Sequence, residues 1–365
     1  MVIDPPAVQA IRHLLDDPEI SEIMINGLGH LFVERDGLMH ELPPIFVSKQ
    51  QIDVLVENLV GLTGRAVNAK SPFVDFRMAD GSRVNIVVPP VALDGPLITI
   101  RKATRSLRTL NDLVDRGALS DRMAFILFTA VRARLNIVFS GGTGTGKTTT
   151  LGMLSAYIPE GERIVVIEDT AELDLQQPHV VRLECRPPNM EGAGAIVLGD
   201  LLKNSLRMRP TRIILGEIRG DEAFEMLNAM SSGHDGSLAV LHASSPAHAI
   251  ARLEMMILGR GLPLPIWAIQ RQIAGALQLV VQHGIFPDGT RRVTHISEVV
   301  GYDKDQVLLR DLFTYEIEGQ DPNGRVLGRF VCTGDKPAFF DKLRRVGGES
   351  VDKALAPSVR RPDAA

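Results

Sequence analysis

Apolar residues in the first hundred positions follow two different spacings. Between Ala7 and Leu15, and again between Ile52 and Leu62, they recur as on one face of a helix. Shorter runs bounded by Asp-Gly or Pro-Pro pairs favour strands at 31–35, 83–88 and 97–101. This mixture predicts a small α+β domain over residues 1–104.

A regular alternation of apolar runs and amphipathic segments begins near residue 121. After a helix-compatible segment at 123–133, strand-like runs are expected at 136–140, 163–168, 212–216 and 237–242. A helical segment follows each of them, at 148–157, 195–208, 221–230 and 246–257. Such alternation predicts an α/β domain with a largely parallel sheet. The runs are nearly continuous in apolar residues, as expected for strands that are covered on both faces.

Changes in composition divide the chain further. A polar and basic stretch at 105–120 predicts a linker between the two domains. After about residue 285, strand-like runs joined by Asp and Gly turns predict a β-rich appendage that ends near residue 345. The Gly-, Pro- and charge-rich segment 346–365 predicts a disordered tail. The second domain is therefore expected over residues 121–345, appendage included.

Composition restricts the class of protein. The chain has 365 residues, of which 45% are hydrophobic and 23% charged, as in ordinary globular proteins. Its net charge of -4 argues against a dedicated nucleic-acid binder. The two cysteines, Cys185 and Cys332, indicate a reducing compartment without a disulfide framework. No signal peptide and no long apolar run is evident, so we expect membrane contact only through partners.

The clearest chemical signal is a glycine-rich segment between a strand-like run and a helical one. Residues 141–148 read GGTGTGKT, which satisfies the G-x-x-x-x-G-K-[ST] pattern. Its backbone N–H groups and the following helix N-terminus favour a bound phosphate. Lys147 is expected to reach the β- and γ-phosphates, and the Thr148 hydroxyl to bind Mg²⁺. The expected nucleotide-binding residues are Gly142, Thr143, Gly144, Thr145, Gly146, Lys147, Thr148 and Thr149.

Acidic residues end two of the apolar runs. Glu217 ends RIILGE, whereas Glu168 ends RIVVIE and is followed by Asp169. Carboxyl ends of parallel strands are where ligands bind in an open α/β sheet. A nucleoside triphosphatase needs one carboxylate near Mg²⁺ and a group that orients water. For Asp169 and Glu172, capping of the next helix is the competing interpretation.

Histidine and arginine complete the candidate site. His242 ends the run SLAVLH at the same expected edge, where it is a candidate sensor of the γ-phosphate or a structural residue. A guanidinium stabilises charge that develops on a transferred phosphoryl group. From spacing alone each arginine is more typical of a solvated or structural residue. The candidates are Arg77, Arg83, Arg101, Arg207 and Arg209.

The order of these blocks resembles the secretion-ATPase superfamily of type II secretion, type IV pili and type IV secretion. GGTGTGKT, VIEDTAEL, RIILGEIRGDEA and HDGSLAVLHASS resemble its Walker A, Asp box, atypical Walker B and His box. Finer stretches, such as DGSRVN and LQQPHVVRLECRPPN, resemble the CpaF/TadA branch, the motor of tight-adherence pili.

The resemblance implies a RecA-like ATPase domain behind a smaller N-terminal domain, assembled as a homo-hexamer that uses ATP and Mg²⁺. It implies that Glu217 is the Walker B glutamate, which holds Mg²⁺ directly or through water. It further implies that Glu168 polarises the attacking water and that His242 is functional. Arg77, Arg83 and Arg101 match segments that supply phosphate-contacting arginines.

The resemblance also implies partners and a place in the cell. These are inner-membrane pilus or secretion platform proteins, with the ATPase in the cytoplasm at the inner face of the membrane. Two alternatives stay open: a nucleic-acid translocase on the same core, and a nucleotide-sensing switch that does not hydrolyse. A basic, aromatic channel would be needed for the first.

Overall fold

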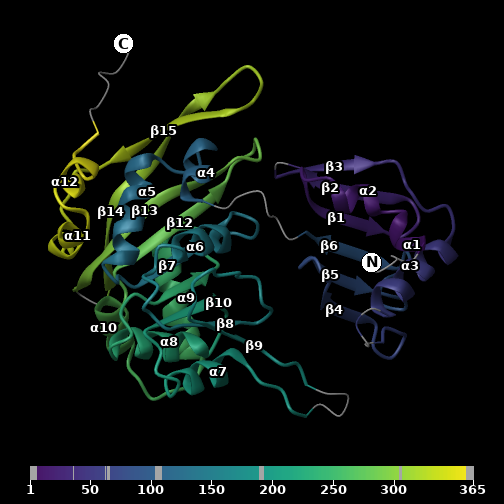
Figure 1. Cartoon of the computed structure of the whole chain (residues 1–365), viewed down its shortest axis with the longest axis horizontal. Coiled ribbons are helices and arrows are strands. Elements are labelled where there is room, and N and C mark those ends of the chain that lie inside the picture. The colour runs from purple at the N-terminus through teal and green to yellow at the C-terminus, as the bar shows by residue number, and fades with distance from the viewer. Residues whose placement is uncertain are drawn as a thin grey trace. The chain divides into compact units, whose positions relative to one another are not determined.

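The computed structural model describes residues 6–35, 37–61, 63, 66–102, 109–188, 193–303 and 306–358. The chain divides into two compact units (Figure 1). The N-terminal unit comprises Met1–Leu107 together with Asp288–Thr290, and the C-terminal unit comprises Arg108–Pro287 together with Arg291–Ala365.

The N-terminal unit is an antiparallel sheet with helices. Its described strands lie in the order β3-β2-β1-β6-β5-β4. Its elements are α1 (Pro6–Gln9), α2 (Arg12–Asp16), β1 (Ile20–Asn26), β2 (His30–Arg35), β3 (Leu38–Leu42), α3 (Lys49–Gly61), β4 (Phe73–Arg77), β5 (Arg83–Val87) and β6 (Leu97–Arg101). Strand residues such as Ile23, Ile86 and Ile98 form one buried cluster with Leu55 and Leu59 of α3. Period-two alternation in the strands therefore buries one face of the sheet.

The C-terminal unit is built around a larger mixed sheet. Its described strands lie in the order β15-β14-β13-β12-β7-β11-β10-β8-β9. These strands are β7 (Ile137–Gly141), β8 (Ile164–Glu168), β9 (Val180–Glu184), β10 (Arg212–Ile218), β11 (Leu238–Leu241), β12 (Leu279–Ile285), β13 (Arg291–Asp303), β14 (Gln306–Gln320) and β15 (Val326–Cys332). Neighbours from β12 to β9 pair in parallel, and β13, β14 and β15 add antiparallel strands to one side.

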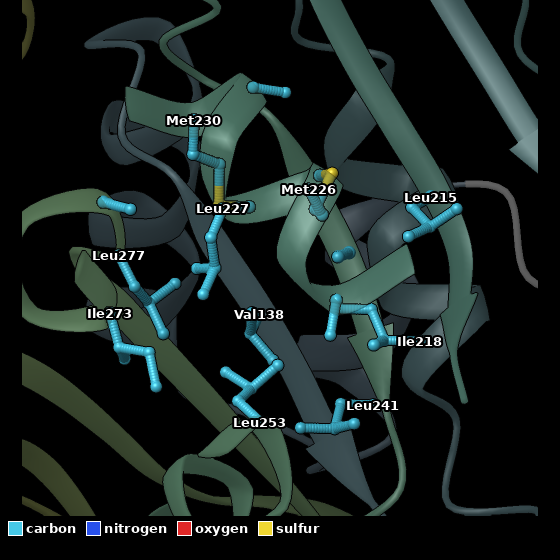
Figure 2. Close-up of a cluster of buried hydrophobic side chains, with 14 of the residues drawn as sticks. Val138, Leu215, Ile218, Met226, Leu227, Met230, Leu241, Leu253, Ile273 and Leu277 are labelled. Atoms are coloured by element: carbon cyan, nitrogen blue, oxygen red, sulfur yellow. The ribbon is translucent and has the colours of Figure 1, made fainter. Parts of the chain in front are cut away.

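Helices cover both faces of this sheet. They are α4 (Leu110–Asp115), α5 (Asp121–Arg132), α6 (Lys147–Ser155), α7 (Leu198–Ser205), α8 (Glu222–Ser231), α9 (Pro246–Gly259), α10 (Ile266–Ala276), α11 (Phe340–Gly347) and α12 (Ser350–Ala354). Figure 2 shows α8, α9 and α10 burying Met226, Leu253 and Ile273 against Val138 and Leu241 of the central strands. Helix α6 packs on β7 and β11 and contacts α4 and α5. The parallel strands are therefore covered on both sides, which explains their unbroken apolar runs.

The expected β-rich appendage (about 285–345) is part of the main sheet. Strand β12 pairs in parallel with β7, and β13, β14 and β15 continue outward from it. The sequence did not show that these strands extend the main sheet, because the apolar pattern of a strand does not reveal its neighbour.

Two segments expected to be irregular contain helices. Within the expected linker 105–120, Thr109 and Asp112 form a capping box that starts α4, whereas 105–108 lie outside the described residues. Within the expected tail 346–365, α12 packs against α5 and buries Val351 completely. A few apolar residues thus order a segment whose composition suggested disorder; residues 359–365 lie outside the described ranges.

The sequence pattern also missed elements that lack a strong periodicity, among them β1, β9 and α10. No helix in the described ranges is both long enough and apolar enough to cross a bilayer.

Candidate nucleotide-binding and catalytic site

The glycine-rich segment forms a tight loop between β7 and α6. Gly144 and Gly146 have φ of 71° and 94°, a region that glycine adopts without steric cost. Inside the loop, Thr145 Oγ1 donates to the Gly142 carbonyl at 2.9 Å, and Lys147 Nζ donates to the same oxygen at 2.5 Å. Helix α6 begins at Lys147, so the positive end of its dipole points into the loop. The loop is thus built to receive an anion.

Two residues outside the loop support it. His283 on β12 is the register partner of Gly141, and a Cβ on Gly141 would lie 2.7 Å from the His283 carbonyl oxygen. Complete burial, with the nearby charge of Lys147, lowers the pKa of His283 to about 3, so this imidazole is neutral at pH 7. Arg291 at the start of β13 donates from Nε to the Gly144 carbonyl at 2.6 Å. Strands β12 and β13 therefore hold the loop from one side.

Glu168 is buried at the carboxyl end of β8. Its Oε1 accepts hydrogen bonds from the backbone N–H of Glu172 at 2.8 Å and of Leu173 at 3.0 Å. Burial raises its pKa, although the two backbone hydrogen bonds partly oppose this effect. A Cβ on Gly216 of the neighbouring β10 would lie 2.8 Å from Glu168 Cγ. Because residue 216 has no side chain, the Glu168 side chain can occupy the space beside it.

Glu217, on β10, lies between a histidine and an arginine. Its Oε1 is 3.3 Å from His242 Nε2, and its Oε2 accepts from Arg219 Nη2 at 2.8 Å. Burial opposes ionisation of Glu217, but the hydrogen bond and charge of Arg219 outweigh it, helped by the charge of Lys147 and, at acid pH where His242 is protonated, by the charge of His242. The pKa of Glu217 is therefore lowered, and this carboxylate is ionised at neutral pH.

His242 follows β11, between β7 and β10 in the sheet. Burial and the charge of Lys147 lower its pKa, whereas Glu217 raises it to a smaller extent. The contact with Glu217 therefore joins a neutral imidazole to a carboxylate at pH 7. His242 also lines an open hollow of ≈ 570 Å³ beside the loop. Other lining residues of this hollow are Gly142, Thr143, Ser244, His248 and Arg252.

Lys147, Glu168, Glu217 and His242 thus meet at the carboxyl ends of adjacent parallel strands, where ligands bind in such sheets. Thr148 and Thr149 lie in the first turn of α6. The Thr148 hydroxyl and the ionised Glu217 carboxylate are oxygen donors of the kind that Mg²⁺ prefers.

The candidate arginines separate into two groups. Arg77, Arg83 and Arg101 are register partners on β4, β5 and β6, so they form one row across the N-terminal sheet. Arg101 Nε lies 3.9 Å from Glu22 Oε1, and Arg77 Nε donates to the Gly81 carbonyl at 3.1 Å. Like charges placed directly opposite each other destabilise a sheet, so this row favours a role in binding an anion.

Arg207 and Arg209 lie elsewhere. Both precede β10, which begins at Arg212. From Arg212 to Glu217 an extended strand spans about 17 Å. The two arginines therefore lie at the opposite edge of the sheet from the phosphate loop of their own unit. Their position before β10 agrees with the structural or solvated role that spacing alone favoured, and their place among the candidates ignored the direction of the strand.

Sequence reasoning missed three residues of this region: Arg219, His283 and Arg291. Arg219 bridges two acids, because its Nη1 also donates to Asp169 Oδ2 at 3.0 Å. The signal for Arg219 was its position two residues after Glu217, on a segment leading away from a strand end. No comparable signal exists for His283, because the pairing of β12 with β7 is not visible in the pattern.

Comparison with known proteins agrees with this architecture. Residues 7–299 match the family described as type II/IV secretion system protein. VirB11 of the type IV secretion system of Brucella suis is 33% identical over 321 residues, covering 80% of this chain and 88% of that protein. An uncharacterized protein of Methanocaldococcus jannaschii is 39% identical over 234 residues, which cover 62% of this chain but only 32% of that protein. The ATPase DotB of Legionella pneumophila has the same fold, with a TM-score of 0.56 at 21% identity over 80% of this chain and 81% of DotB.

The fold and the site define an ATPase with a nucleotide-binding phosphate loop and a RecA-like architecture. The chain belongs to the type II/IV secretion system ATPase family.

Proposed function

We propose that this protein is the hexameric motor of a tight-adherence pilus of the CpaF/TadA type, and that it uses Mg²⁺ and ATP to drive pilus assembly, with retraction as a further mode. It would act in the cytoplasm, against platform proteins of the inner membrane. Membership of the secretion ATPase family supports the coarser part of this proposal, and the branch-specific stretches DGSRVN and LQQPHVVRLECRPPN support the finer part.

The observation that carries the ATP-hydrolysis part of the proposal is the contrast between two neighbouring glutamates. Glu168 has a raised pKa, whereas Glu217 has a lowered one, although they end adjacent strands. A carboxylate with a raised pKa suits a group that accepts a proton from attacking water. A carboxylate that stays ionised suits a group near a metal-bound triphosphate. Environments that separate the pKa values of two neighbouring acids are typical of sites in which the two acids have different catalytic roles.

The remaining residues bind and orient the substrate. Lys147 and the loop N–H groups would hold the β- and γ-phosphates, and neutral His242 would report on the γ-phosphate through Glu217. Mg²⁺, held by Thr148 and by Glu217 directly or through water, would supply neutralising charge to the phosphates. Arg77, Arg83 and Arg101 are proposed to add guanidinium charge during turnover.

The assembly claim is tested by the mass of the full chain in solution with and without Mg-ATP. A hexamer is expected; a monomer under all nucleotide conditions, including with Glu217→Gln, would overturn it. The pilus claim is tested by disrupting the chromosomal gene and complementing with the parent, with Glu217→Gln and with the surface control Arg271→Gln. Surface pilin should return with the parent and the control only.

A second candidate is a motor for type IV secretion rather than for a pilus. The similarity to VirB11 over 80% of the chain favours this candidate. In that case the disrupted strain would keep its pili and lose transfer of a protein or DNA substrate to other cells.

A further inference from the structure

A second hollow, of ≈ 450 Å³, lies at the amino ends of the parallel strands, the edge opposite the phosphate loop. Residues preceding β7, β8, β9 and β10 line it, and we call it the arginine hollow after Arg134, Arg163, His179 and Arg209. No Asp or Glu is among its described lining residues, which are completed by small or neutral ones. Basic side chains from four separate loops thus converge on one place.

The contacts within the arginine hollow leave much of this positive charge uncompensated. Arg163 Nε donates to the Met208 carbonyl at 3.0 Å, and its Nη1 contacts His179 Nε2. Arg134 Nη2 donates to the Thr211 carbonyl at 3.0 Å. Carbonyl oxygens and imidazole nitrogens accept these hydrogen bonds without neutralising the guanidinium groups.

The neighbouring acid, Glu162, is already hydrogen-bonded to another arginine. Both oxygens of Glu162 accept from the fully buried Arg212, at 2.6 and 3.1 Å. Arg134 Nη2 lies farther away, 3.8 Å from Glu162 Oε2. Glu162 is therefore shared between Arg212 and Arg134, and with no acid among its described lining residues the arginine hollow keeps an excess of positive charge.

Backbone strain singles out the same place. Arg134 and Arg209 have φ of 60° and 55°, and within the described ranges they are the non-glycine residues with positive φ. Such a conformation is unfavourable for a long side chain, and Pro210 further disfavours it at Arg209. Internal hydrogen bonds account for Arg134, which also donates to the Asp235 carbonyl at 3.3 Å.

Arg209 differs from Arg134. In the part of the chain that the structure describes, no hydrogen bond or ion pair of the Arg209 guanidinium is found. The chain thus holds an unfavourable backbone conformation and gains no internal contact from the side chain. Strain of this kind, kept by the surrounding structure, marks candidate functional positions.

We propose that the arginine hollow is an oxyanion site that takes a phosphate or carboxylate group, with Arg209 as its principal ligand. Planar guanidinium groups bind both oxyanions in a two-pronged geometry, which explains the use of arginine rather than lysine. The site is separate from the phosphate loop and does not depend on the motor function proposed above. Free phosphate and an acidic protein segment are the two sources of such a group.

The test uses the full chain carrying Lys147→Ala, so that the phosphate loop contributes little anion binding. Inorganic phosphate and a fluorescent tetraglutamate peptide are titrated separately at constant ionic strength. Three further variants are compared in this background: Arg209→Asn, Arg209→Lys and the exposed control Arg271→Gln. Asparagine tolerates positive φ and removes the charge, whereas lysine keeps the charge and the strain.

One or both probes should bind the Lys147→Ala protein, and Arg209→Asn should weaken this binding at least about tenfold, the loss expected for one charge-assisted contact. Arg209→Lys should weaken it less, and Arg271→Gln should leave it unchanged. Without a probe, Arg209→Asn should raise the melting temperature by about 2–4 °C, because it relieves strain. Binding of phosphate would identify a small-anion site, and binding of the peptide alone would identify a docking site for carboxylates.

The proposal is overturned if neither probe binds the Lys147→Ala protein at millimolar concentration, or if Arg209→Asn binds the probes as well as its parent does. A lower melting temperature of Arg209→Asn would also contradict it, because Arg209 would then be a structural residue.

Discussion

Replacing Gly216 with alanine should disable catalysis while leaving nucleotide binding in place. The added Cβ would lie 2.8 Å from Glu168 Cγ and 3.4 Å from Glu168 Cβ. Since β8 and β10 are buried, paired strands, the Glu168 side chain has to move rather than the backbone. Overpacking of this kind costs about 1–3 kcal/mol.

The displacement also affects chemistry. If Glu168 loses one of its backbone hydrogen bonds, the folded state loses roughly a further 1.5–3 kcal/mol of stability. A misplacement of a catalytic group by about 1 Å typically lowers the rate on the order of 100-fold. We therefore expect kcat of Gly216→Ala to fall about 100-fold. Affinity for ATP should change little, because the phosphate loop follows β7, which is not a neighbour of β8 or β10.

The assay is steady-state ATP turnover together with equilibrium binding of a fluorescent ATP analogue. Gly220→Ala is the matched control, because its added Cβ would meet only Glu222 Oε2, at 3.8 Å. In a Glu168→Ala background the clash with Cγ disappears, so Gly216→Ala should then cost little stability. Parent-like turnover by Gly216→Ala, or the same loss of stability with and without the Glu168 side chain, would refute the reasoning.

Two further predictions concern pH. Because the pKa of buried His283 is about 3, the unfolded chain takes up a proton below pH 6.5 that the folded form does not accept. The free energy of unfolding should therefore fall by about 2 kcal/mol between pH 7 and pH 5. His283→Leu should abolish this contribution to the pH dependence. Urea unfolding of both proteins at the two pH values measures it, and a difference between them that is independent of pH would show that His283 is not the cause. Arg219→Gln should raise the pKa of Glu217 and move the acidic limb of kcat to higher pH, whereas Arg219→Lys should move it less. An acidic limb that stays at the parent's position would mean that Arg219 does not control Glu217.

Much of the site could be predicted because its residues follow a simple rule of the fold. Glu168, Glu217 and His242 each stand at or just after the end of an apolar run, Lys147 follows another such run across the glycine-rich loop, and the carboxyl ends of parallel strands share one edge. The local sequence pattern therefore indicated both the residue types of the site and the edge of the sheet at which they lie. The same rule places Arg209 outside this site, because it precedes a strand and so lies at the other edge of the sheet.

The rest depended on which strands are neighbours. The need for glycine at 216 is visible only once β10 is paired with β8, and His283 supports the loop only because β12 pairs with β7. Strand order is set by long-range packing, which a single sequence does not display. The bridge of Arg219 between Asp169 and Glu217 likewise requires two chain segments that are 50 residues apart.

The central claim is that Glu217 and Lys147 divide catalysis and binding in an ATP-hydrolysing motor. The most direct test measures ATP turnover and ATP binding of the purified full chain beside Glu217→Gln and Lys147→Ala. We predict that the parent turns over, that Glu217→Gln binds ATP but loses most of its rate, and that Lys147→Ala loses binding as well. Parent-like turnover by Glu217→Gln would contradict the account.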